Sequence, residues 1–99
     1  MRKLKTTRWN VLDHLRTEKD CLLYLEAAFE EAPDDPAFIT KAIGDVARAK
    51  GMMQIARRTG LAREALYRSL SADGNPSFAT VTKVLNALGL QLAARKLAA

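Results

Sequence analysis

The fold is decided by the stretch MMQIARRTGLAREALYRSL, residues 52–70, which reads as two short helices joined by a tight turn. Gly60 can adopt the positive φ that ends a helix and turns the chain. Ala56 leaves room for the second helix to approach the first. Leu66 and Leu70 form an inward-facing apolar pair at i, i+4 spacing. This pattern predicts a helix-turn-helix.

The outward face of the second helix carries four side chains suited to reading DNA bases in the major groove: Arg63, Glu64, Tyr67 and Arg68. An arginine can donate a pair of hydrogen bonds to guanine O6 and N7. Tyr67 can pack on a thymine methyl or bond a phosphate. Glu64 can accept from cytosine, or it can instead pair with Arg68 within the helix.

A second group of residues is expected to contact DNA phosphates. Basic and polar side chains, together with backbone amides at helix N-termini, commonly hold the phosphate backbone without reading sequence. The residues assigned to this role are Gln54, Arg57, Arg58, Ser77 and Lys83. Each of them, taken singly, also fits an ordinary surface position.

Residues 36–90 resemble the lambda-repressor-like (XRE) DNA-binding domain, and most closely the probable addiction-module antidote proteins, which are antitoxins of bacterial toxin–antitoxin pairs. The residues that carry the resemblance are Ala42–Gly51, Gly60–Tyr67, Ser69–Ser71, Gly74–Thr80 and Ala87–Leu90. One departure is Ala62, where the family more often has Ser or Thr. The second helix of the motif therefore lacks a good N-cap.

The resemblance implies two activities and two partners. The chain would neutralise a toxin of the RelE/ParE superfamily, and it would bind double-stranded operator DNA to repress the shared operon. Because one recognition helix covers only a few base pairs, a homodimer on the DNA is expected. A stand-alone helix-turn-helix repressor without a toxin partner is the alternative. An interacting helical module that has lost DNA binding also stays open.

Charge divides the chain into three segments: residues 1–9 carry +4, residues 10–47 carry −6 and residues 48–99 carry +7. Only the middle segment can offer carboxylates to a basic toxin, and the last is suited to a polyanion. Apolar side chains of the basic arm could anchor beside those carboxylates. The residues predicted to bind the toxin are Trp9, Leu12, Glu26, Glu30 and Glu31.

Local signals place the remaining helices of an all-α, five-helix fold. Thr17 to Ala32 reads as a helix opened by a Thr17–Asp20 capping box, and Asp35-Pro36 opens the next one. Ser77 caps a last helix that runs to about Leu88. The predicted organisation is an N-terminal arm (1–16), a helical domain (17–90) and a tail (91–99) that fits either strand or helix.

The predicted core combines apolar residues of all five helices: Leu22, Phe29, Ile43, Val46, Ile55, Ala56, Leu66, Phe78, Val81 and Leu85. Leu15, together with the neighbouring apolar side chains of the arm, is expected to dock either on this domain or on a partner.

Composition argues against an enzyme. The chain has one histidine, His14, and one cysteine, Cys21, at a spacing that builds no metal site. No cofactor is expected, because the glycines are scattered turn residues. The single cysteine fits a reducing cytoplasm, and no apolar run is long enough to cross a membrane.

Overall fold

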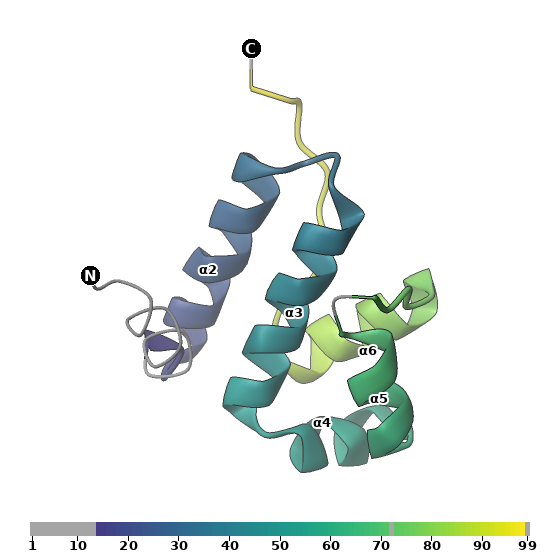
Figure 1. Cartoon of the computed structure of the whole chain (residues 1–99). Coiled ribbons are helices and arrows are strands. Elements are labelled where there is room, and N and C mark those ends of the chain that lie inside the picture. The colour runs from purple at the N-terminus through teal and green to yellow at the C-terminus, as the bar shows by residue number, and fades with distance from the viewer. Residues whose placement is uncertain (1–13, 72, 99) are drawn as a thin grey trace, which may run out of the picture.

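The computed structural model describes residues 14–71 and 73–98, and the regular structure labelled in that part of the chain is all α-helical. Five helices follow one another: α2 (Glu18–Glu31), α3 (Pro36–Lys50), α4 (Met52–Thr59), α5 (Arg63–Ser69) and α6 (Phe78–Ala87) (Figure 1). The predicted five-helix, all-α organisation is confirmed for these residues.

The helix starts predicted from capping residues are confirmed. At α2 the Thr17 hydroxyl accepts from the Asp20 amide at 3.1 Å, and the Asp20 carboxylate accepts from the Thr17 amide at 3.1 Å. At α3 the Asp35 carboxylate accepts from the Phe38 amide at 3.2 Å, with Pro36 as the first helical residue. Each bond satisfies an amide that a helix N-terminus leaves unpaired.

The two short helices expected in residues 52–70 are present as α4 and α5. Gly60 ends α4 with φ +77°, and α5 begins after Ala62, whose side chain makes no capping bond. Leu66 and Leu70 are each only 1% exposed, so the i, i+4 pair faces the core as predicted.

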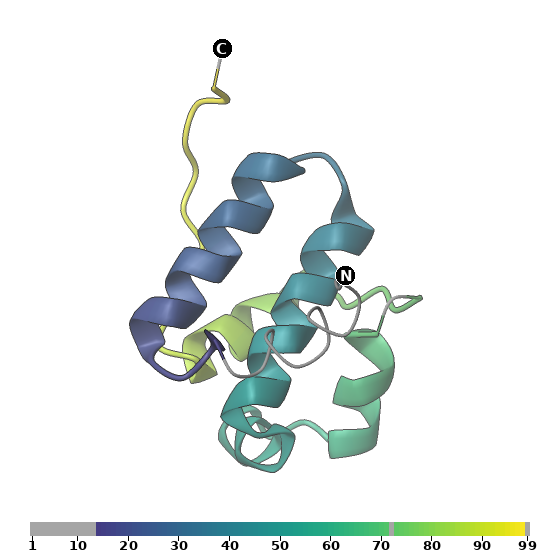
Figure 2. The ribbon, with the colours of Figure 1, turned by 60° about the vertical axis from the view of Figure 1, so that its left-hand side comes forward.

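The central helix α3 has α2 packed along it on one side and α4 following directly from its end, with α6 packed against α4 (Figures 1 and 2). Gly44 of α3 lies against the end of α5, where a Cβ would collide with the Leu70 carbonyl oxygen. The core residues from α3, α4 and α5 include Ile43, Val46, Ile55 and Leu66.

Two predicted core residues are exposed, and these predictions are wrong. Leu22 is 40% exposed, because α2 turns the stripe Cys21, Leu25 and Ala28 toward α3. Phe78 is 73% exposed, since it is the first residue of α6 and the buried residues of that helix lie in its second half.

The chain on either side of the helical unit also packs onto it. Leu15 is 5% exposed and belongs to the core, so this residue docks on its own domain. Residues 90–98 form neither strand nor helix. Leu90 and Leu92 nevertheless pack partly buried against the core.

Candidate functional site

The four residues predicted to read bases all lie exposed on α5. Leu66 fixes the opposite side of this short helix in the core, which turns Arg63, Glu64, Tyr67 and Arg68 to solvent. The Tyr67 side chain is 46% exposed, so it is not part of the packed core. The helix therefore presents two guanidinium groups, a carboxylate and a phenol on one surface.

Glu64 and Arg68 do not pair in the structure. The salt bridges within residues 14–71 and 73–98 join Lys41 and Arg48 to Asp45, and Arg95 to Glu30. The side chains of Glu64 and Arg68 are thus not held by each other, so both can meet a ligand.

On α4, Arg57 is exposed and Gln54 is half-buried. The sequence predicted that Arg58 contacts a DNA phosphate, but the structure also gives this side chain a contact within the protein. One of its guanidinium nitrogens donates to the Ala87 carbonyl at 3.1 Å, across to the end of α6. An arginine has five donors, so the others remain for a phosphate. Arg58 therefore also ties α4 to α6.

Ser77 is the N-cap of α6, and its hydroxyl accepts a hydrogen bond from the Thr80 amide at 3.1 Å. Lys83 is exposed one turn and a half further along. The expected phosphate contacts thus come from two helices, α4 and α6, that pack against each other. We predict that residues of both helices contact the DNA backbone.

The carboxylates predicted to bind the toxin, Glu26, Glu30 and Glu31, are all exposed on α2. The turn to α3 adds Asp34 and Asp35, also exposed. Trp9 and Leu12, the predicted apolar anchors, lie outside the described residues.

The acidic helix and α5 lie on opposite sides of α3 in both views of the ribbon (Figures 1 and 2). The acidic side chains of α2 and the basic side chains of α5 are therefore separated in space. The two surfaces can be occupied without competing for the same face of the molecule.

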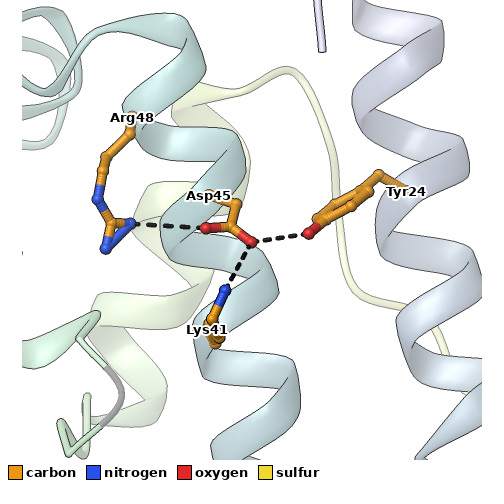
Figure 3. Close-up of polar contacts among 4 residues, drawn as sticks. All are labelled: Tyr24, Lys41, Asp45 and Arg48. Atoms are coloured by element: carbon orange, nitrogen blue, oxygen red, sulfur yellow. Dashed lines mark hydrogen bonds and ion pairs between the residues drawn. The ribbon is translucent and has the colours of Figure 1, made fainter. Parts of the chain in front are cut away.

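A polar network joins α2 to α3 at Asp45, whose side chain is only 13% exposed (Figure 3). The Tyr24 hydroxyl donates to one carboxylate oxygen at 2.7 Å, and Lys41 lies 3.4 Å from the same oxygen. Arg48 lies 3.9 Å from the other. Burial, reinforced by the hydrogen bond to Asp45, raises the pKa of Tyr24, so the phenol stays protonated and keeps donating.

Sequence reasoning missed this network. The available signal was a lone carboxylate, Asp45, at the edge of the apolar face of a helix, with Lys41 four residues before it and Arg48 three residues after it. Helical spacing alone predicts these two ion pairs. No local pattern identifies Tyr24, because its partner is 21 residues away in the chain.

The part of the chain that the structure describes offers few residues for metal binding or nucleophilic catalysis. Those residues contain no cluster of three or more His, Cys, Asp or Glu side chains able to hold a metal ion. Burial raises the pKa of the Cys21 thiol, which keeps it in the weakly nucleophilic protonated form. None of the described helices has the length and apolar character to span a membrane.

Comparison with known proteins gives two matches. The family model described as "Probable addiction module antidote protein" matches residues 5–96. An uncharacterised protein of Haemophilus influenzae (strain Rd) is 49% identical over 83 residues, which is 84% of each chain. No solved structure matches the chain.

Proposed function

The chain belongs to the family of probable addiction module antidote proteins, and we propose that it is an antitoxin with two ligands. One ligand is a small basic toxin encoded beside it, of the RelE/ParE type. The other is the operator of the shared operon, which the chain represses. The observation that carries the proposal is the pair of oppositely charged surfaces on α2 and α5, on opposite sides of α3.

Operator binding is supported by the exposed face of α5. A lambda-repressor-like unit places the second helix of its motif in the major groove, where Arg63 and Arg68 would bond guanine edges. Phosphate contacts from α4 and α6 would fix the register, and the net charge of +5 on residues 48–89 favours a polyanion.

Toxin binding is supported by the acidic face of α2. A toxin that cleaves RNA or binds the ribosome needs a basic active surface, because its substrate is a polyanion. Glu26, Glu30 and Glu31 offer carboxylates to such a surface, exposed and away from α5. The α5 face would remain free, so toxin, antitoxin and operator can form a ternary complex.

The toxin half of the proposal is tested by co-purification. The tagged full chain is expressed together with the small reading frame that adjoins its gene, and captured proteins are identified by mass. We expect the adjoining basic protein at a fixed stoichiometry. If only the antitoxin candidate is recovered, the stand-alone repressor is the better description.

The DNA half is tested by a gel shift with the chain's own upstream region at low salt, against a scrambled duplex of equal length. We expect a specific complex that weakens as salt rises. Binding to neither duplex would leave the chain as a protein-binding module only, and equal binding to both would contradict sequence-specific operator recognition.

A further inference from the structure

Residues 90–98 run as an extended segment alongside α2, toward the turn between α2 and α3 (Figures 1 and 2). Gly89, at φ +82°, starts the segment next to the Glu18 carboxylate. Arg95 lies 3.5 Å from Glu30, near the end of α2. The helix rises about 18 Å between Glu18 and Glu30, and six extended residues from Gly89 to Arg95 span about 20 Å. The segment is therefore long enough to run along α2 from Glu18 to Glu30.

The two parts of this segment are attached differently. Residues 90–92 are held by the Leu90 amide, which donates to the Leu85 carbonyl at 2.8 Å, and by the partly buried side chains of Leu90 and Leu92. Residues 93–98 are exposed throughout. Within the described chain, residues 91–98 make no backbone–backbone hydrogen bond. The salt bridge from Arg95 is thus the polar contact that holds the outer part.

That salt bridge is weak and easily exchanged. The Arg95 and Glu30 side chains are 69% and 70% exposed, and ion pairs this open to water contribute little. Another cation offered to Glu30 can therefore replace Arg95 without breaking a packed contact. Until it does, Arg95 and the neighbouring Lys96 reduce the negative potential of this face.

We propose that residues 93–98 are a displaceable strap, which seats Arg95 on Glu30 and must leave when a basic polypeptide docks on the acidic face of α2. In toxin capture, which rests on the proposed function, a cationic side chain of the toxin takes the place of Arg95. The strap is thus an internal competitor that lowers affinity for weakly basic chains and yields to a partner with many cations.

The first test uses decalysine as the basic polypeptide and the full-length chain at low salt, with affinity measured by calorimetry. Arg95→Gln removes the seated cation, and Lys96→Gln is the matched control, because it removes the same charge one residue away without breaking the salt bridge. We expect Arg95→Gln to bind roughly two- to five-fold more tightly than Lys96→Gln, the range for an exposed ion pair. Equal affinities, or no binding of decalysine to Arg95→Gln, would overturn the proposal.

The second test follows the strap directly with a spin label at Leu97→Cys, a position that is 77% exposed. Cys21 is buried, and the parent chain serves as the control for labelling there. The label should be restricted in the free chain and more mobile after decalysine addition or in the Arg95→Gln background. A line shape that neither change alters would show that Arg95 does not hold the strap.

The outcome for the strap is separable from the outcome for the toxin. If the toxin co-purifies but leaves the Leu97→Cys label unchanged, the strap proposal fails and the antitoxin function stands. If decalysine releases the label but no toxin is recovered, the strap stands and the toxin-binding function fails.

Discussion

Among single residues, Asp45 makes a polar contact between α3 and α2. Its carboxylate is nearly buried and takes a hydrogen bond from Tyr24 across the α2–α3 interface. The cations of Lys41 and Arg48 compensate its charge, but they stand on α3 itself. Only Tyr24 therefore links the two helices through this group.

Replacing Tyr24 with Phe keeps the ring and removes the donor to Asp45. We expect a loss of about 1 kcal/mol in the free energy of unfolding at pH 7, measured with urea. Because the folded-state pKa of Tyr24 is raised, its stabilising contribution is present below the ordinary tyrosine pKa of about 10 and declines as pH rises above it. The difference in unfolding free energy between the parent and Tyr24→Phe should therefore shrink above about pH 10.

Tyr67→Phe is the matched control, since that ring is exposed on α5. It should change the unfolding free energy little at pH 7. A Tyr24→Phe chain as stable as Tyr67→Phe at pH 7 would show that the bond to Asp45 contributes nothing net.

At the scale of elements, the start of α2 depends on a capping box. The Thr17 backbone amide bonds the Asp20 carboxylate and holds the pKa of Asp20 below its usual value. A depressed carboxyl pKa stabilises the fold above the unfolded-state pKa, and this contribution is lost as pH falls through the folded value.

Asp20→Ala should therefore lower the melting temperature at pH 7, and the difference from the parent should shrink below about pH 4. Asp34→Ala, which removes an exposed carboxylate from the α2–α3 turn, is the control and should change the melting temperature little. A difference independent of pH would mean that the Asp20 charge is not what caps α2.

The function proposed for α5 makes a prediction about base reading. Arg63→Ala and Arg68→Ala should each cost about 1–3 kcal/mol on the operator and less on other DNA. Lys83→Ala, on α6, should instead weaken all sequences alike and reduce the salt dependence by about one unit. If both arginine variants bind the operator like the parent, the recognition face lies elsewhere.

At the scale of the whole molecule, the two charged surfaces should act independently. Charge reversal at Glu26, Glu30 and Glu31 is expected to slow toxin association and weaken capture, because it removes electrostatic complementarity. Operator binding by the same folded variant should not weaken, since α2 and α5 are on opposite sides of α3. Unchanged toxin affinity in this variant would show that α2 only supports the core and does not bind the toxin.

Symmetry is the other property of the whole molecule. One α5 helix reads only a few base pairs, so we expect two copies on an inverted repeat with half-sites roughly 34 Å apart. We expect the contact between copies to involve α6 or the tail from Leu90, and Phe78 is 73% exposed at the start of α6. Phe78→Glu should lower the dimer fraction in sedimentation and on DNA. A footprint on a single asymmetric half-site would count against the dimer.

Local residue patterns were enough to predict the helices and most of their ends. Thr17, Asp35, Gly60 and Ser77 act through bonds or dihedral angles within a few residues, so their effects can be read locally. The exposed face of α5 was predicted for the same reason, since helical periodicity sets it once Leu66 is placed inside.

Contacts between different helices could not be predicted in this way. The choice of Cys21 over Leu22 for the buried stripe of α2 depends on where α3 lies, and the exposure of Phe78 depends on how far the core extends. The bond from Tyr24 to Asp45 and the seat of Arg95 on Glu30 join residues far apart in the chain. Such pairings have no local signal, because they are set by the packing of whole helices.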